Sequence, residues 1–87
     1  MGLREDFLDA LIGGHIGRGM IVKRSEFMAF FSGKYADNTT GCFLSNSEID
    51  TSDHSPTYHK FTMRLSEGVY GVHPSSIYER LVDLGSM

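Results

Sequence analysis

Three of the four histidines of this 87-residue chain fall in the stretch HSPTYHKFTMRLSEGVYGVHP, residues 54–74. With the single cysteine, Cys42, the side chains of His54, His59 and His73 offer the nitrogen and sulfur ligands that zinc prefers. Their spacing contains neither a Cys-x-x-Cys pair nor two close histidines on one helix face, the patterns typical of zinc sites. We therefore interpret the histidines as hydrogen-bonding surface residues, and we expect neither a metal nor another cofactor.

The remaining reactive groups do not predict catalysis. Cys42 lies in TGCFL, between a glycine and two apolar residues, where cysteine is more often a small buried hydrophobe than a nucleophile. The glycines of GGHIGRG, residues 13–19, lack the strand and helix context of a nucleotide-binding loop. The spacing of the acidic residues, serines and histidines predicts neither a pair of catalytic carboxylates nor a catalytic triad. We expect a protein that is not an enzyme.

Composition limits the class of protein. A chain of 87 residues with 40% hydrophobic residues forms one domain, residues 1–87, with a modest core. The sequence lacks an apolar run long enough to cross a bilayer, and acidic residues precede the first apolar ones, unlike a secretory signal. A single cysteine excludes an internal disulfide, which favours a cytoplasmic location. The net charge of −3 argues against bulk attraction to polyanions but leaves room for a locally basic face.

Apolar spacing predicts helices in the first half of the chain. One is expected over residues 3–12, ended by glycines, with Arg4 in solvent and an inward face of Leu3, Phe7, Ala10 and Leu11. Residues 20–23 form a short extended run. A second helix is expected over residues 26–35, capped by Ser25 and centred on an aromatic face of Phe27, Phe30 and Phe31.

The middle of the chain is ambiguous. A short or irregular third helix could begin at Asn38, Thr39 or Thr40, although Gly41 and the serines lower its helix propensity. Its inward residues would be Phe43 or Leu44, followed by Ile49.

The Ser55-Pro56 pair is a favourable helix start, so a short helix is expected over residues 55–61. The apolar period then changes to two, which predicts a hairpin wing over residues 62–73 with Glu67-Gly68 at its turn. The expected register places Leu65 opposite Tyr70 and Met63 opposite Val72 on one buried face. A bulged turn with a left-handed Gly68 is an equal alternative.

A last helix is expected from Pro74, with Ser76 and Glu79 at capping-box spacing and Gly85 after its end. Its apolar stripe consists of Ile77, Leu81 and Leu84.

This order of elements resembles a winged helix, a helix-turn-helix followed by a β-hairpin. The resemblance rests on SNSEIDTSDHSPTYHKF, residues 45–61, as the helix pair, and on FTMRLSEGVYGVHP, residues 61–74, as the wing. It implies an α+β fold that is mainly helical, with a three-helix core and a two- or three-stranded antiparallel sheet.

A winged helix implies a DNA-binding transcriptional regulator that contacts double-stranded DNA through its short helix and its wing. Weak binding per monomer would be offset by a homodimer formed through Ile77, Leu81 and Leu84. The nucleic-acid contacts implied by the resemblance are Ser55, Thr57, His59, Lys60, Arg64, Lys23, Arg24 and Lys34.

A protein-binding adaptor or inhibitor on the same scaffold is the alternative function. Acidic residues near the expected helix pair, Glu48, Asp50 and Asp53, favour a protein partner over DNA.

Overall fold

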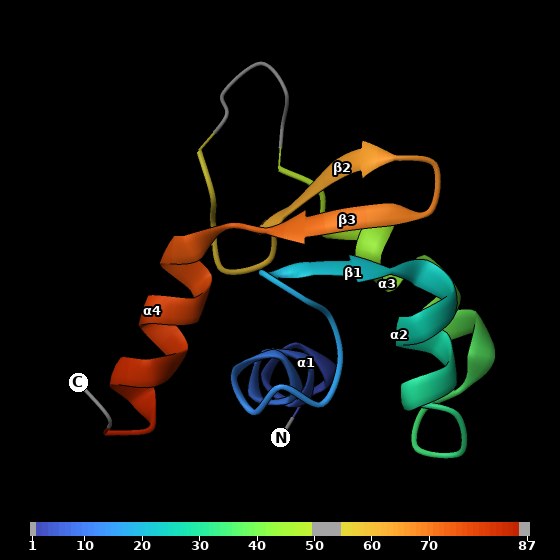
Figure 1. The fold of residues 1–87 in the computed structure, drawn as a ribbon, viewed down its shortest axis with the longest axis horizontal. Coiled ribbons are helices and arrows are strands. Elements are labelled where there is room, and N and C mark those ends of the chain that lie inside the picture. Colours follow the sequence, from blue (N-terminus) through green and yellow to red (C-terminus); the bar gives the residue numbers. More distant parts are fainter. Residues whose placement is uncertain (1, 50–54, 86–87) are drawn as a thin grey trace.

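The computed structural model describes residues 2–49 and 55–85, and this part of the chain contains four helices and three strands. They follow in the order α1 (Leu3–Ile12), β1 (Ile21–Lys23), α2 (Arg24–Phe30), α3 (Asp37–Asn46), β2 (Thr62–Ser66), β3 (Val69–Val72) and α4 (Pro74–Asp83). The strands form one antiparallel sheet in the order β1-β3-β2, which confirms the α+β class. In Figure 1 the sheet crosses the middle of the molecule, with α1 below it, α4 and α2 at its two sides and α3 behind. Each helix of the described residues is too short or too polar to cross a lipid bilayer.

Helix α1 has the bounds that its apolar spacing predicts. Leu3, Phe7 and Ala10 are buried, and the chain leaves the helix through Gly14, whose φ of 75° suits glycine. The expectation that Arg4 lies in solvent is wrong, because this residue is only 7% exposed. The loop before β2 covers it.

Residues 55–61 form that loop and contain no helix, so the prediction of a short helix at the Ser-Pro pair is wrong. The backbone makes a tight turn in which the amide of Thr57 donates to the carbonyl of Lys60 at 2.8 Å. Tyr58 anchors the turn on α1. Its carbonyl accepts a hydrogen bond from Arg4 Nε at 2.8 Å, and the Arg4 guanidinium lies 3.9 Å from its ring centroid. These tertiary contacts outweigh the local helix signal.

Helices α2 and α3 exist, but their boundaries differ from the prediction. Helix α2 begins at Arg24, before the expected cap Ser25, and ends at Phe30 rather than at residue 35. Helix α3 is regular over ten residues despite Gly41, and its N-cap is Ala36 rather than Asn38, Thr39 or Thr40. Burial of Thr40 and Leu44 on its inner side compensates for its weak propensity.

The core is built mainly from phenylalanines that come from four segments. Phe7 on α1 meets Phe27 on α2 edge-on, with ring centroids 4.9 Å apart, and Phe27 stacks on Phe43 of α3 at 5.5 Å. Phe31 and Phe61 are also buried. The predicted aromatic face of α2 is therefore confirmed as the centre of the core, and contacts of this geometry add to the free energy gained by burial.

The hairpin forms with its turn at Glu67-Gly68, and Gly68 has a φ of 71°. Its predicted register is wrong because a bulge at Leu65 shifts the pairing, so Arg64 lies opposite Tyr70 and Met63 opposite Gly71. As a result, Leu65 is 53% exposed instead of buried. Thr62, which pairs with Val72, is fully buried on the inner face of the sheet, where the predicted register placed Met63 opposite Val72.

Helix α4 begins at Pro74, as predicted. Its cap is His73, whose Nδ1 accepts a hydrogen bond from the amide of Ser75 at 3.1 Å, so the predicted capping box starting at Ser76 is wrong. Ile77 packs against the core and Leu81 is half-buried. Leu84 is 49% exposed, so only the first two residues of the stripe predicted to form a dimer face inward.

Candidate nucleic-acid interface

The eight side chains predicted to contact nucleic acid lie in three separate places. Lys23, Arg24 and Arg64 come together beside the hairpin turn, where they line a hollow of about 620 Å³. Lys34 lies elsewhere, in a groove next to α1. The other four belong to the loop before β2: Ser55, Thr57, His59 and Lys60.

The hollow beside the hairpin turn is predominantly basic. Its three cations come from the end of β1, the start of α2 and the middle of β2, and among its lining residues only Glu67 is acidic. Arg64 reaches this place because the bulge pairs it with Tyr70, on the helix-facing side of the sheet. The hollow can attract an anionic group such as a phosphate.

Cations from separate segments also lie along α3. Arg24 Nε donates to the carbonyl of Gly41 in the middle of this helix at 2.9 Å. The ammonium of Lys60 donates to the carbonyl of Asn46 at the helix end at 2.5 Å. Arg64 shares the hollow with Arg24. Helix α3 thus has positive charge beside it from its middle to its end.

The exposed face of α3 was not predicted as a site. After the exposed Asp37 in its first turn, the helix carries uncharged polar side chains at helical spacing. The exposed uncharged residues include Asn38, Thr39, Cys42, Ser45 and Asn46. The exposure of Cys42 corrects the expectation that it is buried. A polar stripe at positions i, i+4 and i+7 was the sequence signal for this face, but the weak helix propensity of the segment concealed it.

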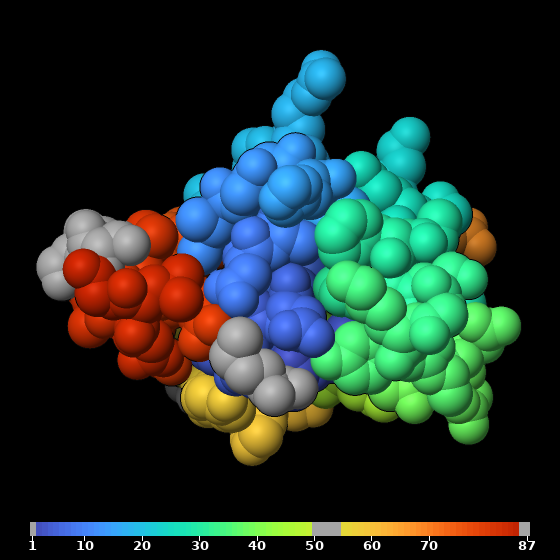
Figure 2. Space-filling view, turned by 90° about the horizontal axis from the view of Figure 1, so that it is seen from below, coloured from blue at the N-terminus to red at the C-terminus, as the bar shows by residue number. Residues whose placement is uncertain are grey.

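The loop residues are accessible but lie apart from the basic hollow. His59 packs edge-on against Tyr58, with ring centroids 4.9 Å apart, and the Tyr58 hydroxyl donates to Glu5 on α1 at 2.5 Å. In Figure 2 this loop (yellow) lies beside the N-terminal part of α1 (blue). Thr57 and His59 therefore lie near α1, whereas Lys60 reaches α3.

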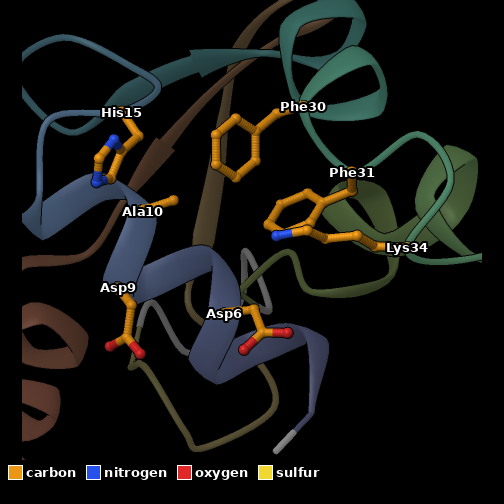
Figure 3. Close-up of a pocket in the computed structure, with 7 residues that line it drawn as sticks. All are labelled: Asp6, Asp9, Ala10, His15, Phe30, Phe31 and Lys34. Carbon is orange, nitrogen blue, oxygen red and sulfur yellow. The ribbon is translucent and has the colours of Figure 1, made fainter.

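A groove of about 370 Å³ holds Lys34 and lies between α1 and the end of α2. In Figure 3 the rings of His15 and Phe30 lie at one end of the groove, and the carboxyl groups of Asp6 and Asp9 lie at the other. The two rings are nearly stacked, with centroids 6.5 Å apart.

The carboxylates of this groove already have partners. Asp6 accepts a hydrogen bond from the Tyr35 hydroxyl at 2.5 Å, which raises the pKa of Tyr35, and Asp9 is paired with Arg80. They are therefore poorly placed to act as a general acid and base. Lys34 is separated from the other predicted nucleic-acid contacts.

Within residues 2–49 and 55–85, no three side chains of histidine, cysteine, aspartate or glutamate lie close enough together to bind a metal ion. His54 lies outside the described residues. Comparison with known proteins gave no significant match to a family model, a curated protein or a solved structure.

Proposed function

We propose that this protein is a small DNA-binding regulator of transcription that reads DNA with α3. The observation that carries the proposal is that Arg24 and Lys60 donate to carbonyls of α3, while the exposed residues of this helix after Asp37 are polar and uncharged. Arg64 adds a third cation in the hollow that it shares with Arg24. Cations that flank a polar helix match the usual division of labour, in which charges hold phosphates and amide or hydroxyl groups contact base edges.

The dimensions and the order of elements support this use. The major groove is about 12 Å wide and accepts one α-helix. Helices α2 and α3 are followed by the β2–β3 hairpin, an order that supports the resemblance to a winged helix with α3 in the reading position. Asn38 and Asn46 can pair with adenine, and Ser45 can contact several bases.

The same geometry implies modest affinity for each chain. The net charge is −3, and Asp37 and Glu67 lie close to the proposed surface. We propose a homodimer through the exposed apolar side chains of α4 and the residue after it, namely Tyr78, Val82 and Leu84. Of the stripe predicted from the sequence, only Leu84 takes part. The protein would act in the cytoplasm, where the exposed thiol of Cys42 stays reduced.

Fluorescence anisotropy with labelled duplex DNA, first random and then selected for binding, tests the proposal. Arg64→Ala should weaken binding and lower the slope of log affinity against log salt by about one unit. Lys34→Ala removes the same charge from the groove beside α1, outside the basic hollow, and is the matched control, which should leave the affinity unchanged. Asn38→Ala should instead relax the preference for the selected sequence.

Two results contradict the proposal. One is an absence of measurable binding at low salt for random and selected duplexes alike. The other is an equal loss of affinity in Lys34→Ala and Arg64→Ala. That result would mean that the affinity depends on the total charge of the protein rather than on the surface around α3.

A further inference from the structure

The two faces of the sheet differ in what covers them. The inner face packs on the helices, and its residues Val22, Thr62, Tyr70 and Val72 are at most 5% exposed. In Figure 1 the described helices lie below, beside and behind the sheet. The solvent face of a half-covered antiparallel sheet is normally polar, because its residues alternate with the buried ones.

Here the outer face is apolar. Gly71 pairs with Ile21 on one side and Met63 on the other, so these residues share a face, and Val69 shares it two positions along β3. Leu65 belongs to this face as well, because its Cδ1 would lie 3.5 Å from a Cβ atom added to Gly71. Ile21 is 44% exposed and Leu65 is 53% exposed. We call Ile21, Met63, Leu65 and Val69 the outer sheet patch.

One edge of the outer sheet patch is positively charged. A hollow of about 330 Å³ beside β1 is lined by Ile21 and Val69 together with Arg18 and Lys23. Its single carboxylate, on Glu26, already accepts hydrogen bonds from the amides of Gly17 at 3.1 Å and Lys23 at 3.5 Å.

The two cations of this edge outnumber its one carboxylate. Neither Arg18 nor Lys23 forms a direct ion pair within residues 2–49 and 55–85. Apolar groups and an excess of positive charge thus lie side by side on one surface, a combination that is typical of a binding site.

The combination distinguishes between possible occupants. A nucleic acid is a poor match for the aliphatic side chains, because the surfaces with which proteins bind nucleic acids are polar and strongly basic. A two-fold contact between copies of this chain would use the same patch twice and bring both pairs of cations toward one another. A partner with apolar anchors and carboxylates satisfies both features.

We propose that the outer sheet patch docks an acidic segment of a partner protein. Apolar side chains of that segment cover Ile21, Met63 and Leu65, and its carboxylates meet Arg18 and Lys23. The patch shares Lys23 and Val69 with the basic hollow, whereas Ile21, Met63 and Leu65 do not line that hollow. Variants of Leu65 therefore test this docking separately from the DNA-binding proposal.

Selection of short random peptides displayed on phage against the full chain tests this docking. The selected peptides should combine Asp or Glu with aliphatic or aromatic residues, and synthetic copies should bind less tightly as salt rises. Leu65→Ser and Lys23→Glu should each weaken peptide binding by about tenfold or more. Both residues are exposed, and a thermal melt like that of the parent chain checks that each variant folds.

Matched controls separate the patch from other surfaces. Ile12→Ser removes an exposed apolar side chain from the end of α1 and should leave peptide binding unchanged. Leu65→Ser should leave DNA affinity unchanged, so the two proposals fail separately. The docking proposal is overturned if the selected peptides bind Leu65→Ser and Lys23→Glu as well as the parent chain. It is equally overturned if Leu65→Ser converts a dimer to a monomer, because a second copy would then cover the patch.

Discussion

Two hydrogen bonds join Arg80 on α4 to Asp9 on α1, Nε to Oδ1 at 2.7 Å and Nη2 to Oδ2 at 3.0 Å. The Arg80 side chain is 8% exposed, whereas that of Asp9 is 34% exposed. The hydrogen bonds to Asp9 raise the pKa of Arg80 above its ordinary value. A bidentate pair of this kind fixes orientation as well as distance, so it sets how the last helix lies against the first.

Asp9→Ala should destabilise the fold, because it leaves a buried guanidinium without its carboxylate. We expect a loss of about 1–3 kcal/mol in the free energy of unfolding, measured by urea denaturation. Arg80→Met removes the charge while keeping much of the volume and should cost less. Glu67→Gln, at the exposed turn of the hairpin, is the control. Equal losses in Asp9→Ala and Glu67→Gln would show that the pair contributes nothing specific.

The interaction of Glu5 with Tyr58 should make stability depend on pH. The hydrogen bond from the Tyr58 hydroxyl lowers the pKa of Glu5 from its ordinary 4.5, and a weaker contribution comes from Arg4. A carboxyl with a lower pKa in the folded state binds fewer protons there than in the unfolded chain. Its contribution is therefore complete above the ordinary pKa and is lost as the pH falls through the folded value.

Tyr58→Phe should raise the pKa of Glu5 and weaken this pH dependence. Urea denaturation of the parent and the variant between about pH 3 and pH 6 measures it, and the parent should lose more stability on acidification. Tyr78→Phe, an exposed tyrosine on α4, controls for loss of a hydroxyl. An unchanged slope in Tyr58→Phe would contradict the assignment of the pKa shift to this hydrogen bond.

Local signals account for the elements that were predicted correctly, and distant contacts account for the rest. The bounds of α1 follow from apolar spacing, and the start of α4 follows from a proline, because both signals act within a few residues. The 55–61 loop carries an equally good local signal but contacts Arg4, which is 54 positions away from Tyr58. No pattern within the loop could reveal that contact.

The candidate site shows the same division. Lys23, Arg24 and Arg64 were predicted as contacts from the resemblance to a winged helix, and the fold brings them together. The face of α3 was missed because its exposed polar residues after Asp37 are uncharged, and its importance depends on cations that only the tertiary structure places beside it. The alternative of a left-handed Gly68 is confirmed, but the bulge lies at Leu65 rather than in the turn, a position that strict alternation does not reveal.

Met20 occupies a backbone position that does not suit it. Arg18 and Ile21 exchange two backbone hydrogen bonds at 2.9 Å and 3.1 Å, and the two residues between them, Gly19 and Met20, have φ values of 60° and 63°. This is a type I′ turn, which favours Asn and Gly. Met20 is the single residue other than glycine with positive φ among the described residues.

Met20→Asn should therefore stabilise the protein by about 0.5–1 kcal/mol, because asparagine tolerates the left-handed conformation better. Met20→Val should destabilise it, since a β-branched side chain tolerates this conformation poorly. The melting temperature should rise by a few degrees for asparagine and fall for valine. A lower melting temperature for Met20→Asn would mean that the side-chain contacts of Met20, which is 38% exposed, outweigh the backbone strain.

Thr62 connects the proposed reading helix to the sheet. Its fully buried hydroxyl donates to the carbonyl of Leu44 on α3 at 2.8 Å, across 18 positions of sequence. That carbonyl lies in the last turn of α3, where partners within the helix run out. Thr62→Val keeps the shape but removes the donor, so we expect a loss of about 1–2 kcal/mol in the free energy of unfolding. Thr62→Ser keeps the hydroxyl and loses one methyl group, which should cost about 1 kcal/mol or less.

Amide hydrogen exchange distinguishes the two effects. In Thr62→Val the amides at the end of α3 should exchange faster than those of α1, because the missing hydrogen bond loosens α3 from β2. In Thr62→Ser exchange should change evenly across both helices, since packing is weakened while the connection to Leu44 remains. If Thr62→Val and Thr62→Ser gave the same exchange pattern, the hydroxyl of Thr62 would not be the contact that positions α3.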